Sequence, residues 1–161
     1  MTDDARHIAN TTWEALYRTQ ATVTRELLER DIWEGLSTRE YAVLMALAAE
    51  PEGLRVTELG QDVLISQPGM SKLIDRLMSR ELVERCEDED ARARRVRLTK
   101  AGVQLQARMA AAIAEAAADI LGRGLSTQQQ IQLRELVLAV LNGVPTPFAA
   151  IQRKAMERNM K

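Results

Sequence analysis

The chain has 161 residues, 46% of them hydrophobic and 3% aromatic, with a formal net charge of -1. This length suits one domain or two small intertwined parts, and the near-neutral charge excludes a generally basic, histone-like DNA binder. The single cysteine, Cys86, excludes an internal disulfide and suits a reducing compartment. Because no apolar run approaches the roughly 18 residues of a membrane span and the polar N-terminus resembles no signal peptide, we expect a cytoplasmic protein without membrane contact.

The first third of the chain predicts two helices. One is expected from about residue 4 to residue 30, because apolar residues recur there at helical spacing without proline or glycine. The next begins at Ser37, which forms a capping box with Glu40, and runs to about residue 49. Pro51 then ends this helix and begins a turn.

The middle of the chain predicts a helix-turn-helix followed by a β-ribbon. A short helix is expected after Thr57, and a second helix, capped by Ser66, runs to about Arg80 after a tight connection. Alternating apolar and polar residues over 82–85 and 95–98 then suit two paired strands. A helix that can enter the major groove, followed directly by a ribbon, is the sequence outline of a winged helix-turn-helix.

The last third of the chain predicts further helices. Thr99 caps an alanine-rich helix to about Leu121, another runs from Ser126 to about residue 143, and residues 148–156 suggest a last short helix. These helices and the N-terminal one carry more apolar residues than one chain can bury, which predicts a homodimer. The alternative is a monomer in which they fold onto the central unit.

The predicted fold class is mainly α with a small β-ribbon, that is, a winged helix-turn-helix core plus long N- and C-terminal dimerisation helices. We expect residues 1–34 to form the N-terminal dimerisation helix and residues 35–100 the DNA-binding domain. Residues 101–161 form the C-terminal dimerisation helices in this division. The sequence contains no internal repeat and no low-complexity linker.

On a helical wheel, the second helix of the motif has an apolar face and a polar face. The apolar face is expected to pack inward and holds Met70, Leu73, Ile74, Leu77 and Met78. The polar face carries side-chain types that read base edges or hold phosphates. The DNA contacts selected from this helix are Ser66, Gln67, Ser71, Lys72 and Arg76. Gln67 and Arg76 are predicted to contact base edges. The alternative is that this polar face of the helix is simply exposed to solvent and binds nothing.

The segment between the two strands, residues 86–94, presents acidic residues first and arginines afterwards. Arg92 and Arg94 on a thin projection suit a narrow minor groove, whose negative potential attracts arginine. Asp90 is positioned to hold Arg92 extended through a charge-assisted hydrogen bond, and Arg95 on the returning strand is selected as a phosphate contact. The alternative is an exposed loop whose charges balance one another.

In these residues the chain resembles the MarR family of bacterial transcription regulators. The matching pieces are the helix ISQPGMSKLIDRL, the strand LVER and the pattern D-x-R-x5-LT-x-x-G, formed by Asp90, Arg92, Leu98, Thr99 and Gly102. The resemblance extends over essentially the whole chain, because the helix order and length also fit. One departure is Glu81, where the family usually has glycine, so a strained left-handed helix cap or a different helix end is expected there.

The resemblance implies an obligate homodimer whose first and last helices intertwine, with one winged helix-turn-helix in each subunit. It implies binding to palindromic promoter sites, usually in repression. It also implies loss of DNA affinity when a small phenolic or anionic ligand binds between the lobes. The aromatic side chains selected for that pocket are Trp13, Tyr17 and Tyr41, and the alternative is that they are ordinary core or interface aromatics.

The sequence therefore predicts a dimeric, sequence-specific DNA-binding transcriptional regulator, a repressor that a small aromatic or anionic ligand releases. The alternatives are a winged-helix protein-interaction module without DNA binding and a redox-sensing regulator that acts through Cys86. An enzyme is not expected, because one histidine and one cysteine far apart form no nucleophile–base pair and no glycine-rich phosphate loop is present. No cofactor is predicted, and His7 alone makes no metal site.

Overall fold

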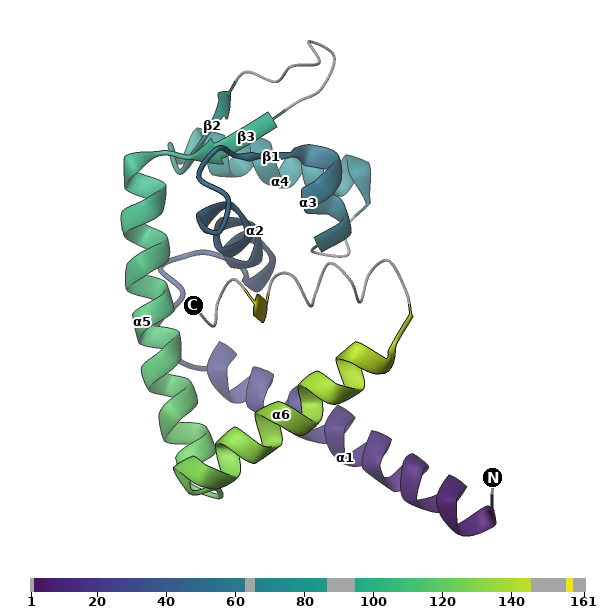
Figure 1. Ribbon diagram of the computed structural model, residues 1–161. Coiled ribbons are helices and arrows are strands. Elements are labelled where there is room, and N and C mark those ends of the chain that lie inside the picture. Colours follow the sequence, from purple (N-terminus) through teal and green to yellow (C-terminus); the bar gives the residue numbers. More distant parts are fainter. Residues whose placement is uncertain (1, 63–65, 87–94, 146–155, 158–161) are drawn as a thin grey trace.

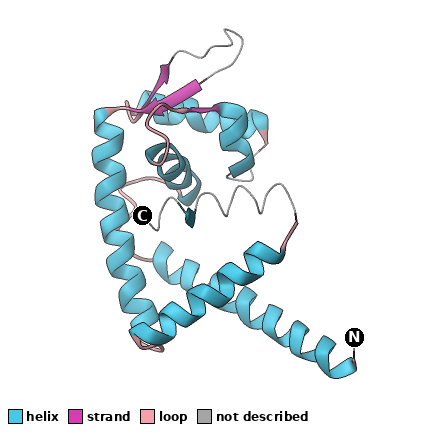
Figure 2. Ribbon diagram, in the orientation of Figure 1, coloured by secondary structure: helices cyan, strands magenta, loops and turns pink. Residues whose placement is uncertain are grey.

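The computed structural model describes residues 2–62, 66–86, 95–145 and 156–157 (Figure 1). The helices are α1 (Asp3–Leu28), α2 (Thr38–Ala48), α3 (Val56–Asp62), α4 (Gln67–Ser79), α5 (Lys100–Gly122) and α6 (Thr127–Gly143). The strands are β1 (Leu54–Arg55), β2 (Val83–Cys86) and β3 (Arg95–Leu98). Figure 2 shows long helices and one small sheet, which lies beside the N-terminal end of α5. Most of the short helix expected over residues 148–156 lies outside the described residues.

The three strands form one antiparallel sheet in the order β1-β3-β2. The predicted ribbon is β2 paired with β3, in a register that sets Val83 opposite Leu98 and Cys86 opposite Arg95. The sequence pattern does not predict β1, because two residues are too few to display an alternation. The predicted fold class, mainly α with a small ribbon, is confirmed.

Local capping signals determine where the helices begin. The N–H of Ser37 donates to Oε2 of Glu40 at 2.8 Å, and the N–H of Glu40 donates to Oγ of Ser37 at 3.3 Å. The predicted capping box at the start of α2 is therefore confirmed. Thr99 Oγ1 caps α5 by accepting from the N–H of Gly102 at 3.0 Å, and Ser126 forms a second capping box at the start of α6.

One apolar core joins α2, α3, α4, the sheet and the first half of α5. Its fully buried large side chains include Leu44, Leu47, Leu59, Met70, Leu77, Val96 and Met109. The predicted inward face of α4 is confirmed, since Met70, Leu73, Ile74 and Leu77 are buried and Met78 is partly buried. Because this face packs on the core, the opposite face of α4 is left open.

α1 and α6 lie outside this core, and neither contains a buried residue. α5 extends away from the winged unit toward them (Figure 1). Ion pairs attach the end of α1 to the second half of α5. Arg123 reaches Glu26 at 2.8 Å and Asp119 at 2.7 Å, while Arg30 contacts the same two carboxylates. Hydrogen bonds from Arg30 and Arg123 hold the pKa of Asp119 below its ordinary value.

α4 ends in a left-handed residue. Glu81 follows the helix with a φ of 59°, and the N–H of Leu82 donates to the carbonyl of Leu77 at 3.0 Å, as in a Schellman motif. The predicted left-handed cap at Glu81 is confirmed, and a non-glycine residue there costs about 1 kcal/mol or more. Within the described ranges, no helix is both long and apolar enough to cross a membrane.

Candidate nucleic-acid interface

The first turn of α4 is built around two residues that favour a helix start. Ser66 is exposed, and its Oγ accepts a hydrogen bond from the N–H of Gly69 at 3.4 Å. Pro68 follows in the first turn, where a missing N–H leaves no bond unmade. The side chain of Gln67 lies outside the described part of the chain. The hydroxyl of Ser66, selected from the sequence as a DNA contact, therefore also caps the helix.

The polar face of α4 is open to solvent. Lys72 and Asp75 are exposed, Ser71 is partly buried, and the side chain of Arg76 is 70% exposed. Lys72 and Arg76 are four residues apart, so their charges lie one above the other on the helix surface. A row of cations and hydroxyls on one open helix face can contact phosphates and base edges together.

Arg76 has a partner in α2 that the sequence pattern does not reveal. Its Nη2 lies 3.1 Å from Oε1 of Glu40, whose side chain is only 2% exposed. Burial raises the pKa of Glu40, but hydrogen bonds from Ser37 and the charges of Arg76 and Arg80 outweigh it and keep that pKa below its ordinary value. Arg76 therefore compensates a buried charge. Because a guanidinium has five N–H donors, others remain for an external acceptor.

Of the four DNA contacts selected on the wing (β2, β3 and the segment between them), only Arg95 lies within the described residues. Asp90, Arg92 and Arg94 lie outside the described residues. Arg95 is partly buried, and its Nη1 donates to the carbonyl of Gly53 at 2.7 Å. This bond attaches β3 to the turn before β1, so at least one donor of Arg95 serves the fold rather than a phosphate.

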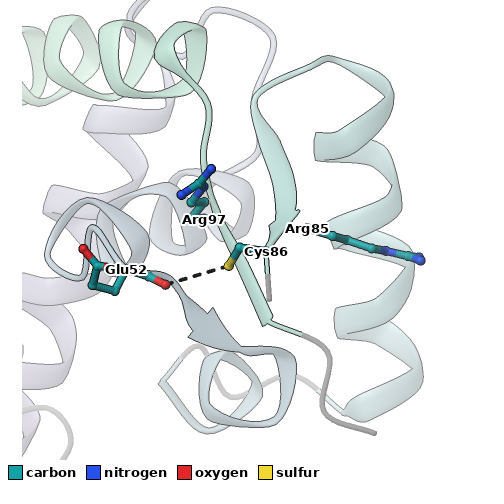
Figure 3. Close-up of a pocket in the computed structure, with 4 residues that line it drawn as sticks. All are labelled: Glu52, Arg85, Cys86 and Arg97. Carbon is teal, nitrogen blue, oxygen red and sulfur yellow. Dashed lines mark hydrogen bonds between the residues drawn. The ribbon is translucent and has the colours of Figure 1, made fainter. Parts of the chain in front are cut away.

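An open pocket beside the wing strands is lined by Glu52, Arg85, Cys86 and Arg97 (Figure 3). The Cys86 thiol lies 3.8 Å from the carbonyl oxygen of Glu52. Arg97 Nε donates to Glu84 Oε1 at 2.8 Å, and this bond raises the pKa of Arg97. In Figure 3, Arg85 points away from the other three residues. No cluster of three or more metal-ligating side chains occurs among the residues described.

The aromatic residues selected for a ligand pocket belong to two separate ring pairs. Trp13 and Tyr17 lie on α1 with ring centroids 6.0 Å apart, and both are about three-fifths exposed. Tyr41 instead packs edge-to-face on Trp33 at 6.1 Å, and burial raises its pKa. Trp33 donates from Nε1 to the carbonyl of Leu27 at 2.8 Å. Sequence reasoning overlooked Trp33, whose one signal is its position between two predicted helices.

Comparisons with known proteins agree with this geometry. Residues 34–95 match the model of the MarR family. The transcriptional repressor CouR, bound to a 23-mer DNA duplex, is 27% identical with a TM-score of 0.69, over 78% of this chain and 89% of that one. Sco3205, a MarR-family transcriptional regulator from Streptomyces coelicolor in complex with DNA, is 25% identical with a TM-score of 0.65, over 91% of both chains.

A ligand complex is also among the similar structures. The PcaV transcriptional regulator from Streptomyces coelicolor, in complex with its natural ligand, is 27% identical with a TM-score of 0.58, over 89% of this chain and 97% of that one. The search of curated proteins gave no match. The family match spans α2 to the start of β3, and the structural matches extend over most of the chain. The resemblance seen in the sequence is thus confirmed over residues 34–95, which match the MarR family, and most of the chain is similar in structure to the MarR-family transcriptional regulator Sco3205.

Proposed function

We propose that the protein is a homodimeric, sequence-specific regulator of transcription that acts in the cytoplasm and has no enzymatic activity. In this proposal α4 enters the major groove, and Arg92 and Arg94 reach the adjacent minor groove. The observation that carries it is the division of α4 into a buried apolar face and an open polar face with Lys72 and Arg76. The structures of CouR and Sco3205, which contain DNA, support the same use of the fold.

A second copy of the chain is the proposed cover for the apolar side chains of α1 and α6. The exposed ones include Ile8, Trp13, Leu133, Leu136, Val137 and Val140. A surface of this kind on a single chain favours association. A twofold pair sets two recognition helices about 34 Å apart, one turn of B-DNA, so the proposed operator is palindromic.

The proposed role is repression that a small aromatic or anionic ligand releases. PcaV, which was crystallised with its natural ligand, supports a ligand site in a chain of this fold. Trp13, Tyr17 and Tyr41 are the proposed contacts. A thermal-shift screen of small aromatic acids, followed by competition with DNA, tests this part: a compound that raises the melting temperature and lowers DNA affinity supports it.

Selection from a random duplex library tests the DNA-binding function directly. Rounds of selection on the purified protein are expected to enrich one palindromic sequence. Fluorescence anisotropy should then give an affinity for it roughly a thousandfold or more above that for unrelated duplex, at fixed salt. Enrichment of no sequence, together with equal binding to all duplexes, would contradict the proposal and favour a protein-interaction module.

We expect Arg92→Ala to weaken binding to most duplexes and to flatten its salt dependence. Each lost phosphate or minor-groove cation reduces the slope of log affinity against log salt by about 1. Anisotropy titrations at several salt concentrations measure this slope. Arg25→Ala is the control, because it removes an equal charge from α1. The Arg25 side chain is 83% exposed and pairs with Glu29, the C-cap of the same helix. Equal slopes for both variants would remove Arg92 from the interface.

Arg76→Ala is expected to relax sequence preference at particular base pairs, by roughly 1–3 kcal/mol for each lost bidentate contact. The same change also removes the cation 3.1 Å from the buried Glu40 carboxylate, so the melting temperature should fall as well. Arg76→Lys separates the two effects, because lysine keeps the charge near Glu40 but lacks the planar fork. If Arg76→Lys keeps the parent's preference at every base pair, Arg76 serves Glu40 and reads no base.

A further inference from the structure

The segment between α1 and α2 contains two consecutive left-handed residues. Glu34 has a φ of 45° and Gly35 a φ of 74°. The left-handed region is unfavourable for a residue with a side chain, so surrounding contacts have to hold Glu34 there. On the α1 side, the bond from Trp33 Nε1 to the carbonyl of Leu27 already fixes the segment.

The backbone of this segment is bonded to the end of the recognition helix. Arg80, the C-cap of α4, donates from Nη1 to the carbonyl of Gly35 and from Nη2 to the carbonyl of Glu34, both at 3.1 Å. A planar guanidinium bonded to two successive carbonyls fixes orientation as well as distance. The last turn of α4 is thus held against residues 34 and 35.

The side chain of Glu34 is bonded to α5. Arg108 Nε lies 3.2 Å from Oε1 and Arg108 Nη2 lies 3.0 Å from Oε2, a two-point contact. The hydrogen bonds from Arg108 lower the pKa of Glu34, and those to Glu34 raise the pKa of Arg108. Glu34 therefore bonds to the C-cap of α4 through its carbonyl and to α5 through its carboxylate.

We propose that Glu34 is a positioning residue that fixes the recognition helix relative to α5 and thereby narrows the spacing of DNA half-sites that the dimer accepts. This inference rests on the proposed DNA-binding function. In a twofold dimer the separation of the two α4 helices depends on how each is oriented on the helix that leads to the partner. If the bonds of Glu34 are lost, the orientation of each α4 relative to α5 varies more. The affinity for duplexes with altered half-site spacing then rises relative to the affinity for the preferred spacing.

We expect the Glu34–Arg108 pair to affect the preference for half-site spacing far more than the free energy of unfolding. Its side chains are 44% and 59% exposed, and exposed pairs contribute little to the free energy of unfolding. The apolar packing of Leu105 and Met109 in the core keeps α5 attached to the winged unit without the pair. Glu34→Gln should therefore leave the melting temperature close to that of the parent.

The test uses the full-length protein and duplexes that carry the selected half-site twice. Their centre-to-centre spacing is set at about 10 bp and at one or two base pairs more or less. Glu34→Gln keeps the carbonyl that Arg80 binds, and Arg108→Met keeps an unbranched stem without donors. Each is expected to reduce the ratio of affinities for preferred and altered spacing by about two- to thirtyfold, and the double variant should reduce it no further.

Glu29→Gln is the matched control, because it breaks a surface pair between Arg25 of α1 and the C-cap of that helix, away from the bonds to α4 and α5. It should leave the spacing ratio unchanged. An unchanged ratio in Glu34→Gln, or an equal loss of affinity at every spacing, would overturn the inference while leaving DNA binding intact. Failure of the parent to select any duplex would instead contradict the proposed function.

Discussion

Leu136→Glu is expected to convert the proposed homodimer into a monomer that binds the proposed operator at least about a hundredfold more weakly. Leu136 is 66% exposed on α6. It belongs to an apolar stripe on that helix formed by Leu133, Leu136, Val137 and Val140. A carboxylate in this stripe would lose its hydration without gaining a partner when a second copy packs there. Losing one of two linked half-site contacts removes the gain from simultaneous binding, which is commonly a factor of about 100 to 10,000.

Size-exclusion chromatography with light scattering measures the mass of the variant, and anisotropy measures its affinity. Asn142→Glu is the control, because Asn142 is exposed on α6 and lies on the side of the helix opposite to the stripe at 100° per residue. It should remain dimeric with the parent's affinity. A dimeric Leu136→Glu variant would mean that some other surface joins the subunits. Thermal unfolding of both variants checks that the winged unit, whose apolar core does not include α6, stays folded.

The parts of the fold that could be predicted are those determined by local sequence signals. The capping box at Ser37 and the caps at Ser66 and Thr99 lie within three residues of the groups they bind, so the sequence itself displays them. The inward face of α4 is likewise a property of one helix. β1 could not be predicted, because Leu54 and Arg55 become a strand only through pairing with β3, some 40 residues later.

In the candidate site, too, the features set by local sequence could be predicted and those set by packing between helices could not. Which face of α4 is open follows from its periodicity, whereas what Arg76 contacts does not. The sequence identifies its partner, Glu40, only as part of a capping box. The bonds of Arg80 and Arg108 to Glu34 join residues 46 and 74 positions apart in the chain. Such contacts depend on how helices pack, and no local pattern encodes them.

Gly102→Ala is expected to destabilise the protein by about 2 kcal/mol, although alanine is the better helix former. Gly102 is buried at the start of α5, and a Cβ there would lie 2.0 Å from the carbonyl oxygen of Leu82 and 3.3 Å from Cδ2 of Leu98. That carbonyl cannot retreat freely, because it accepts the N–H of Thr99 at 3.1 Å. Thr99 Oγ1 in turn donates to the carbonyl of Glu81 at 2.6 Å and caps α5.

In the Gly102→Ala variant, the start of α5 and Leu82, which precedes β2, therefore have to move apart. The strands β2 and β3 are expected to shift with them. Overpacking of this kind costs about 1–3 kcal/mol or more, which outweighs the gain of about 1 kcal/mol from helix propensity. The melting temperature should fall by about 4–8 °C at this chain length. Gly122→Ala supplies the comparison, because no atom lies within 4 Å of its added Cβ. It should melt at or slightly above the parent's temperature, and equal melting of both variants would contradict the close approach of α5 to Leu82.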